Sequence, residues 1–563
     1  MIKHWARLVR NGIYYLIRGD FRSFFYRLRI ILAARKQVIT NSMAYWGVLT
    51  APHTLFVAHL VAERLREHGW VVDILTEPLV KFPHQMYVVI CAQIFTKLPP
   101  DGKRIIFQME QSISSRWFSK YYLNILENSI AVLDYALVNL EFLADKGIRY
   151  PHVYYLPIGA SKTYMAEAKP EGAVYKTYDL LFYGDAKSSP RRRKLLDVLR
   201  QHFSVHICNE IFGVEMAQEI RKARAVINLH YYEGALLETT RIQECLSLGV
   251  PVISESSRDQ NEYPWLKDVV IYFNEGDEEG MISAARATLE RIGDNTLSCS
   301  DINRSVEASE KYFKFMFDRF LISRNILSFD KLQVDLLPIP EQTDKIVLSM
   351  PETIERRRVY EVNRLNNCAV FDGIRRSPGW IGCGLSYSYI ARHALYHGIK
   401  RLMVMEDDVL LPIDFEEKLH IVHAYLDAKS DEWDIFVGVI ASLHKNVKIL
   451  AVEVFEGMQF VTINCMTSMV CNIYNERSLQ MLSKWDADDQ NAQTNTIDRF
   501  LERQASLRVV VVLPFLVGHR EDVNSTLWGF ANGQYSIMIS GSERKLMIKT
   551  DEFLMLRRDN VGG

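Results

Sequence analysis

An apolar run from Arg401 to Met405 leads directly into three consecutive acids, Glu406, Asp407 and Asp408. The run has the length and composition of a buried β-strand, so the acids are expected at the C-terminal end of that strand. Adjacent carboxylates are hard oxygen ligands, which suit a divalent cation such as Mn2+ or Mg2+ with positions left open for phosphate. A solvated acidic turn is the alternative for an isolated triplet of acids.

The length of 563 residues exceeds what one hydrophobic core supports and predicts two domains. The formal net charge is -1, so no overall electrostatic field indicates a nucleic-acid partner. The eight cysteines form no Cys-x-x-Cys pair, which predicts reduced thiols in a cytoplasmic protein. The sequence contains no apolar run of membrane-spanning length and no signal-peptide core at its start, so we expect neither.

The first 37 residues differ from the rest of the chain. They carry nine lysines and arginines against one acid, Asp20, and between these lie apolar and aromatic residues at largely helical spacing. Basic amphipathic helices of this kind bind anionic membrane surfaces, which predicts a peripheral protein on the inner face of the cytoplasmic membrane. The alternative is a pair of helices packed on the protein body with solvated arginines.

Apolar runs alternate with helical patterns over residues 38–330, which predicts an α/β domain with parallel sheets. Its two halves are expected at about 38–170 and 178–330, joined by a connection containing Pro170 and Gly172. A loop around Gly47 is expected to precede a helix over 53–68. The expected strands of the first half are 38–40, 71–75, 86–92, 104–108 and 153–157.

The second half is expected to begin with a strand over 178–184. This strand ends at Gly184, and a helix starts near Pro190 with Arg191 as its first basic residue. Glycine at a strand end allows close backbone approach, and a helix N-terminus favours phosphate. The arginines of this helix could add charge-assisted hydrogen bonds to a diphosphate, although basic residues also occupy ordinary solvated helix faces.

A strand over 226–230, a helix opened by Glu238 and a strand over 251–255 follow in order. Arg241 lies three residues before Glu244, so both side chains project from one face of the helix. This arrangement resembles the nucleotide-sugar half of GT-B glycosyltransferases of the family 4-like group. The resemblance implies that the helix start meets a diphosphate and that Glu244 holds the ribose.

One departure from that pattern concerns catalysis. The position eight residues before Glu244 is Leu236 rather than an acid. Glu238 therefore becomes the candidate catalytic carboxylate, unless this half has lost catalysis. The alternative to nucleotide-sugar binding is a plain α/β domain in which Arg241 and Glu244 form a surface salt bridge.

The residues from 344 to 563 form the second expected domain, after a linker at 331–343 that is rich in proline and polar residues. A strand over 345–349 leads into a helix opened by Glu355, and a further helix is expected to start at Gly382. Together with the acidic tip and two later segments, this order resembles glycosyltransferase family 25, the lipopolysaccharide-type transferases of GT-A fold. Tyr387 stands where that family often has histidine.

The acidic tip supplies the candidate metal ligands of this domain. Asp408 is the main candidate, with Glu406 assisting, and Glu406 or Asp407 could also reach a donor through ribose or water. His519 follows an apolar strand over 509–517, and a late histidine often completes the metal site in GT-A enzymes. A structural loop histidine is the alternative.

Three further residues carry predicted roles. Arg356 and Arg357 follow the first strand of the domain and could meet a nucleotide phosphate or form a salt bridge at the helix start. Asp498 matches a family acid on the acceptor side and is the candidate base for an inverting transfer. The alternative for Asp498 is a carboxylate stabilised at a helix N-terminus.

The predicted function is a bifunctional glycosyltransferase. Its second domain is expected to transfer a hexose from a UDP-sugar, UDP-galactose or similar, with a divalent cation, to a lipopolysaccharide or another lipid-linked or cell-surface glycan. Its first domain is expected to transfer a second sugar or to bind the acceptor glycan. A non-catalytic membrane-associated scaffold for glycans or nucleotides is the alternative of another class.

Overall fold

The computed structural model describes residues 45–561 except 167–174, 337–338, 340–341, 363–367, 431, 505 and 526–531. These residues form two compact units, a first unit within Thr40–Asp318 and a second unit containing Arg319–Gly563. The division falls inside helix α10 (Cys299–Ser323), whereas the sequence analysis placed a linker at 331–343.

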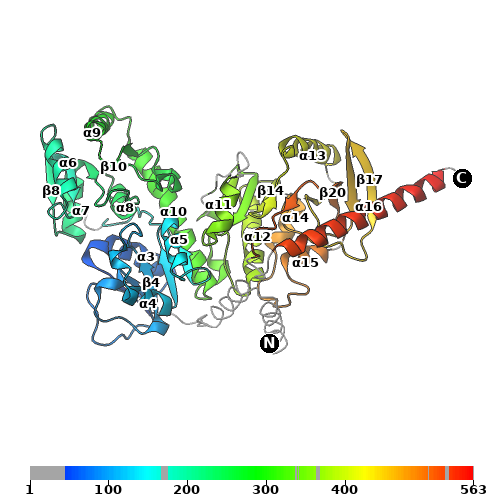
Figure 1. The fold of residues 1–563 in the computed structure, drawn as a ribbon, viewed down its shortest axis with the longest axis horizontal. Coiled ribbons are helices and arrows are strands. Elements are labelled where there is room, and N and C mark those ends of the chain that lie inside the picture. Colours follow the sequence, from blue (N-terminus) through cyan, green and yellow to red (C-terminus); the bar gives the residue numbers. More distant parts are fainter. Residues whose placement is uncertain are drawn as a thin grey trace. The chain divides into compact units, whose positions relative to one another are not determined.

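The first unit contains two parallel sheets with helices as their crossover connections (Figure 1). Its first sheet has the strand order β2-β1-β3-β4-β5-β6, and every pair in it is parallel. The strands are β1 (Tyr45–Leu49), β2 (Val71–Leu75), β3 (Met86–Ile90), β4 (Arg104–Gln108), β5 (Ala131–Asp134) and β6 (Val153–Tyr155). The helices are α3 (Leu55–Glu67), α4 (Lys120–Asn128) and α5 (Leu137–Asp145).

The second sheet of this unit has the order β11-β10-β9-β7-β8 and is also parallel throughout. Parallel strands need crossover connections, which accounts for the alternation seen in the sequence. The strands are β7 (Tyr178–Tyr183), β8 (Val205–Cys208), β9 (Ala223–Asn228), β10 (Val252–Glu255) and β11 (Val270–Phe273). The helices are α6 (Pro190–Arg200), α7 (Gly213–Lys222), α8 (Thr239–Ser247), α9 (Glu278–Gly293) and α10. The predicted parallel α/β architecture of both halves is confirmed.

The expected loop at Gly47 is wrong, because Gly47 lies inside strand β1. A side chain at this position would meet the ring of Tyr87 on the neighbouring strand, at 2.6 Å from the added carbon. The glycine therefore serves close packing rather than a turn. The strand expected at 38–40 and the amphipathic helices expected at 1–37 lie outside the described residues.

The second unit is built on one mixed sheet in the order β13-β12-β14-β19-β16-β20-β18-β17, with a small sheet of β15 and β21 beside it. β14 runs parallel to β12 and antiparallel to β19, so it lies inside the sheet with a partner on each side. The strands are β12 (Lys345–Ser349), β13 (Ala369–Asp372), β14 (Arg401–Glu406), β15 (Val409–Leu410), β16 (Ile435–Val437), β17 (Ile449–Phe455), β18 (Met458–Ile463), β19 (Cys471–Asn475), β20 (Val509–Leu513) and β21 (Gly518–His519). The helices are α11 (Ile354–Val362), α12 (Gly379–Tyr396), α13 (Phe415–Lys429), α14 (Glu476–Ser483), α15 (Ile497–Glu502) and α16 (Gly533–Val561).

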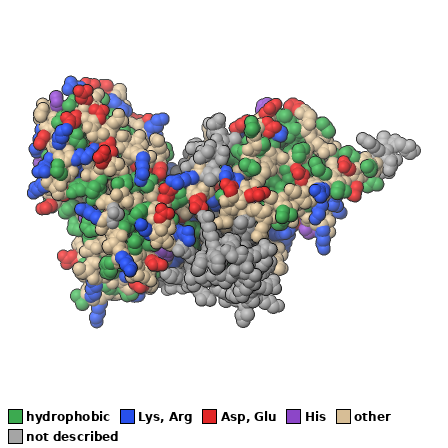
Figure 2. Space-filling model, in the orientation of Figure 1, with side chains coloured by type: hydrophobic (Ala, Val, Ile, Leu, Met, Phe, Trp, Pro, Cys, Tyr) green, Lys and Arg blue, Asp and Glu red, His purple; other side chains and the backbone are tan. Residues whose placement is uncertain are grey.

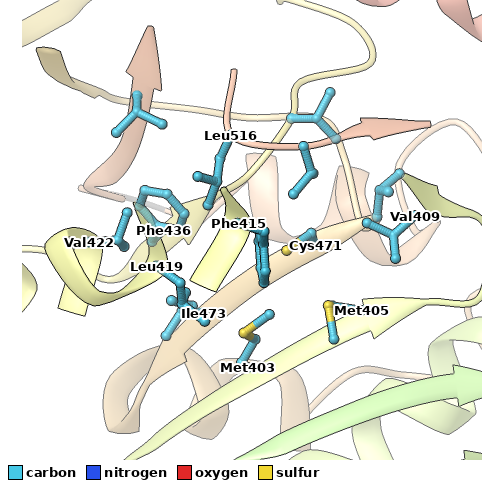
Figure 3. Packing of buried hydrophobic residues seen from close by; sticks show 14 of the residues in the cluster. Met403, Met405, Val409, Phe415, Leu419, Val422, Phe436, Cys471, Ile473 and Leu516 are labelled. Atoms are coloured by element: carbon cyan, nitrogen blue, oxygen red, sulfur yellow. The ribbon is translucent and has the colours of Figure 1, made fainter. Parts of the chain in front are cut away.

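A buried apolar cluster lies beneath the strand that carries the three acids (Figure 3). Met403 and Met405 of β14 belong to this cluster, together with Phe436 of β16, Ile473 of β19 and Leu419 of α13. Each is at most 2% exposed, and burying a side chain of this size contributes about 1.5–3 kcal/mol. The strand is therefore firmly anchored, and the position of its acidic end follows from that anchoring.

The surface of the described residues carries acidic and basic side chains interspersed, as expected for a chain with a net charge of -1 (Figure 2). Within the described ranges, no helix combines the length and the apolar character that crossing a membrane requires.

Gly382 lies within α12, which begins three residues before the start expected from the sequence, at Gly379. A side chain at position 382 would meet the carbonyl oxygen of Ile374 at 2.7 Å and the amide nitrogen of Arg376 at 2.8 Å, and these backbone atoms cannot rotate away. We expect Gly382→Ala to destabilise the second unit by about 1–3 kcal/mol, measured by thermal unfolding. Gly541→Ala in α16 is the matched control.

The control variant Gly541→Ala is expected to stabilise the second unit rather than destabilise it. Nothing lies within 4 Å of a side-chain carbon added at Gly541, and alanine favours the interior of a helix by about 1 kcal/mol over glycine. Equal effects of the two variants would contradict the packing argument for Gly382.

Candidate active sites

Strand pairing brings His519 beside the acidic tip of the second unit. In β14, Glu406 lies opposite Leu348 of the parallel strand β12. The chain then turns at Asp408, and Val409 pairs with His519 in the small sheet of β15 and β21. Two segments more than a hundred residues apart in the sequence are thus fixed next to each other by backbone hydrogen bonds.

One oxygen of Asp408, Oδ2, has three polar neighbours. Asn532 Nδ2 donates a hydrogen bond to it at 3.0 Å, Arg356 contacts it at 2.9 Å, and His519 Nε2 lies at 3.3 Å. The other oxygen, Oδ1, is buried and has no hydrogen-bond partner among the described residues. The same holds in these ranges for His519 Nδ1 and Asn532 Oδ1.

The residue types of this group are ones that bind divalent cations. A carboxylate, an imidazole and an amide oxygen are ligands that Mn2+ and Mg2+ accept, and each has a buried atom with an unused lone pair. Burial alone would raise the pKa of Asp408, but the positive charge of Arg356 and the contact with His519 outweigh burial and hold this pKa well below its usual range. Asp408 is therefore ionised and suited to bind a cation.

The carboxylate of Asp407 differs from that of Asp408, because both of its oxygens accept hydrogen bonds. Arg356 Nε donates to Asp407 Oδ1 at 2.9 Å, and Ser349 Oγ donates to Oδ2 at 2.8 Å. Arg356 also donates to the carbonyl of Asn524 at 2.9 Å. Arg356 thus forms the helix-start salt bridge that was one of its two predicted roles. Arg357 pairs with Asp372 at 2.5 Å.

Glu406 is the third acid of the tip. Burial, and next the negative charge of Asp408, raise the pKa of its carboxyl to about 8. This acid is therefore protonated at neutral pH as long as the only cation close to it is Arg356. The structure thus gives the three consecutive acids three different environments, and Asp408 alone combines an ionised carboxylate with a buried free oxygen.

Asp498 lies in the first turn of α15 and belongs to the same surroundings. Burial, and then the charges of Glu406, Asp498 and Asp408, raise the pKa of the Cys383 thiol. The pKa of the Tyr535 hydroxyl is also raised, first by burial and then by the same acids. The predicted base and the predicted metal ligands therefore converge around one thiol and one phenol.

Asn532 was missed by the sequence analysis. It is fully buried, and its side chain contacts both Asp408 and His519, the latter at 3.4 Å. The only sequence signal is a polar residue immediately before the long helix α16, and such residues are common at helix starts. Its position, 124 residues after Asp408, is fixed by tertiary structure alone.

The first unit gathers charged residues at the C-terminal ends of β7, β9 and β10. Gly184 follows β7 with φ +123°, and a side-chain carbon there would meet Arg241 at 3.0 Å. Arg192 donates to Glu238 at 2.8 Å, and Arg241 binds the other oxygen of Glu238 and also Asn228. Burial would raise the pKa of Glu238, but the two arginines outweigh it and lower this pKa.

Unpartnered polar atoms surround the start of α8. His230 is fully buried, and neither of its ring nitrogens has a hydrogen-bond partner in the described part of the chain. Thr239 Oγ1 and Arg241 Nε are also buried without a partner there. Together with the free N–H groups of a helix start, this arrangement suits an anion such as phosphate. His230 was not among the residues predicted from the sequence.

The remaining two predicted residues of the first unit bind other protein groups. Arg191 binds Glu255, with NH1 to Oε2 at 2.8 Å. Glu244 accepts hydrogen bonds from the hydroxyls of Tyr164 and Tyr183, each at 2.9 Å. Both oxygens of Glu244 are therefore occupied by tyrosines, and the surface salt bridge between Arg241 and Glu244 does not form because Arg241 pairs with Glu238.

Known proteins resemble this chain only distantly. No family model matches it, and no curated protein matches its sequence. Solved structures that it resembles include sucrose-phosphate synthase from Thermosynechococcus elongatus (12% identity, TM-score 0.33, covering 49% of this chain and 98% of that chain). They also include HepE from Anabaena in complex with UDP and glucose (11%, 0.32, 50% and 97%) and a glycosyltransferase from Rickettsia africae (12%, 0.33, 50% and 98%).

Proposed function

We propose that this protein is a glycosyltransferase that uses nucleotide-sugar donors. The observation that carries the proposal is the buried group of Asp408, His519 and Asn532, in which three atoms with lone pairs have no partner among the described residues. Such a group suits a cation that binds the diphosphate of a sugar nucleotide, and the strand ending in acids supports a family 25-like, GT-A-type second unit.

The residues of the second unit would divide the chemistry. The cation, held by Asp408, His519 and Asn532 with Glu406 nearby, would supply charge stabilisation to the departing nucleoside diphosphate. Asp498 would accept the proton of the acceptor hydroxyl as that oxygen attacks the sugar. Arg356 and Ser349 donate to the two oxygens of Asp407, whereas Asp408 keeps a buried oxygen without a partner among the described residues, so Asp408 is the acid of the tip proposed to bind the cation.

The first unit is proposed to bind a second nucleotide sugar in a GT-B-like arrangement. Its support is the pair Arg192 and Arg241 beside Thr239 and His230, at the point where a diphosphate would meet the start of α8. Glu238 is the carboxylate between these arginines and remains the candidate catalytic group there. The alternative is that this unit only binds acceptor glycan. In that case the same residues would bind the glycan without needing a nucleotide.

The proposed acceptor is a lipopolysaccharide or another lipid-linked cell-surface glycan, with residues 1–37 binding the inner face of the cytoplasmic membrane. The proposed donor of the second unit is UDP-galactose or a similar UDP-hexose. Two active sites on one chain would add successive sugars to one acceptor at high effective concentration, because the product of the first transfer stays tethered near the second site.

The test removes the metal from the full chain. UDP release from UDP-glucose, UDP-galactose and UDP-N-acetylglucosamine is measured with Mn2+, with EDTA, and with Mn2+ restored. We expect at least one donor to give UDP release that EDTA removes and Mn2+ restores. Release that resists EDTA would come from the first unit. A scaffold without catalytic activity predicts no UDP release from any donor, and that result would overturn the proposal.

A further inference from the structure

The first unit holds a carboxylate that neither the predicted chemistry nor a salt bridge uses, Glu110. It lies two residues after the end of strand β4, in the half of the unit that contains the first sheet. Its Oε1 accepts a hydrogen bond from Gln93 Nε2 at 2.6 Å. Its Oε2 has no hydrogen-bond partner among the residues that the structure describes.

The side chain of Glu110 is not needed to hold its own loop. Its backbone N–H donates to Gln108 Oε1 at 2.5 Å, and its carbonyl accepts from Gln108 Nε2 and Asn139 Nδ2 at 2.8 and 2.9 Å. Any residue other than proline at position 110 could make these backbone bonds. Keeping a half-buried carboxylate there without an ion pair costs stability, and such costs are typical of functional groups.

The next residue, Gln111, ties this loop to the start of α8. Its Oε1 accepts from the backbone N–H of Leu236 at 2.9 Å, and its Nε2 donates to the carbonyl of Leu236 at 3.1 Å. Leu236 lies two residues before Glu238, which caps α8. The double hydrogen bond therefore fixes the loop of Glu110 and Gln111, from the opposite half of the unit, beside the segment that leads into α8.

The surroundings of Tyr135 also indicate that Glu110 and Glu238 lie in the same region of the unit. The pKa of its hydroxyl is raised first by burial and then by the charge of Asp134. The charges of Asp259, Glu110 and Glu238, which come from both halves of the unit, raise this pKa further. Buried atoms nearby also lack partners within the described chain, namely Gln93 Oε1, Asp259 Oδ2 and the Tyr263 hydroxyl. Polar atoms left open in this way suit a polar ligand rich in hydroxyls, such as a sugar.

We propose that Glu110, rather than Glu238, whose two oxygens bind Arg192 and Arg241, is the general base of a sugar transfer in the first unit, which rests on the proposed function of that unit. The acceptor hydroxyl, of a glycan or of water, forms a bond from its oxygen to the anomeric carbon. The bond from that carbon to the nucleoside diphosphate breaks, and its electron pair leaves with the diphosphate held at the start of α8. Glu110 Oε2 takes the hydroxyl proton, and Gln93 keeps the carboxylate oriented.

The electrostatic surroundings of Glu110 agree with this role. Burial raises the pKa of its carboxyl, while Gln93 and the more distant Arg116 lower it, and the net direction is upward. Other titratable groups that interact with it include Cys91, Tyr122 and Tyr135. A base with a raised pKa holds a transferred proton better than an ordinary glutamate does.

The test uses the full chain carrying Asp408→Asn, so that the second unit contributes no metal-dependent turnover. Hydrolysis of UDP-glucose, UDP-galactose and UDP-N-acetylglucosamine is measured in EDTA, with water as the acceptor, and UDP binding is measured by calorimetry. Glu110→Gln is expected to lower the maximal hydrolysis rate about 10²- to 10⁴-fold and to leave the affinity for UDP unchanged. It should also remove the rise of activity with pH, because only the ionised base accepts a proton.

Two controls separate this inference from the proposed function. Glu77→Gln, an exposed carboxylate in the same half, is expected to change neither rate nor affinity. Arg241→Met is expected to lose UDP binding at the first unit. Unchanged hydrolysis or an unchanged pH profile in Glu110→Gln would overturn the base assignment. The base assignment would also be overturned if the Asp408→Asn chain bound UDP through Arg241 but hydrolysed none of the donors. EDTA-sensitive UDP release by the chain without Asp408→Asn would still support the proposed activity of the second unit.

Discussion

Asp408→Asn is expected to lower the metal-dependent release of UDP at least about 100-fold. A bound cation stabilises the developing charge by several kcal/mol, and every 1.4 kcal/mol corresponds to a factor of ten in rate. Among the three acids of the tip, Asp408 is the one that is ionised and also has a buried oxygen without a hydrogen-bond partner among the described residues. The amide keeps the shape of the side chain but removes its charge, so Mn2+ affinity should fall together with the rate. Calorimetry with Mn2+ and a UDP-release assay measure the two effects.

The matched control is Asp414→Asn, an aspartate of the same unit whose side chain is 49% exposed and pairs with Lys418. It should leave both Mn2+ affinity and turnover unchanged. Arg356 retains Asp407 as a partner in the Asp408 variant, so the fold is expected to persist, and circular dichroism checks this. Full metal-dependent turnover in Asp408→Asn would show that the cation, if any, binds elsewhere.

Glu352→Gln is expected to destabilise the second unit by about 3–5 kcal/mol, the cost of removing the charge of one partner from a buried ion pair. Glu352 and Arg319 are both completely buried, and their two hydrogen bonds measure 2.6 and 2.8 Å. Arg319 also donates to the carbonyl of Gly373 at 2.7 Å, and Arg375 contacts the same carboxylate of Glu352 at 3.4 Å, so the variant removes a negative charge that two arginines share. Scanning calorimetry should show one unfolding transition lowered by roughly 6–20 °C, and the other transition unchanged.

An exposed ion pair in the same unit provides the comparison. Lys418 and Asp414 lie one helical turn apart, with side chains 39% and 49% exposed. Lys418→Met should change stability by less than about 1 kcal/mol, because water screens such pairs. A shift of under 2 °C in Glu352→Gln would mean that the pair relaxes toward water when broken.

Local patterns predicted the elements that carry the candidate sites. The strands at 71–75, 104–108 and 345–349 have the boundaries expected from the sequence, because each is a short apolar run with clear breaks at both ends. The tip at Glu406 to Asp408 follows a strand as expected. Gly47 misled the analysis, because a glycine in a strand is indistinguishable from a turn glycine until the ring of Tyr87 above it is known.

Contacts between distant segments could not be predicted in this way. Arg356 meets Asp407 across 51 residues, and Asn532 meets Asp408 across 124. Glu244 likewise accepts hydrogen bonds from two tyrosine hydroxyls, 61 and 80 residues away, which no local pattern indicated. Side-chain identity states what a residue can bind, whereas the fold decides which partner reaches it first.

The sequence by itself determined the alternation of strands and helices and the delivery of three acids to a strand end, because hydrophobic periodicity is a local property of the chain. The tertiary structure decided which acid is ionised and free, since burial and the positions of Arg356, His519 and Asn532 set the charge of Asp408 and Glu406. It also decided that the loop of Glu110 and Gln111 lies beside the segment that leads into α8, through a hydrogen bond between Gln111 and Leu236 that spans 125 residues.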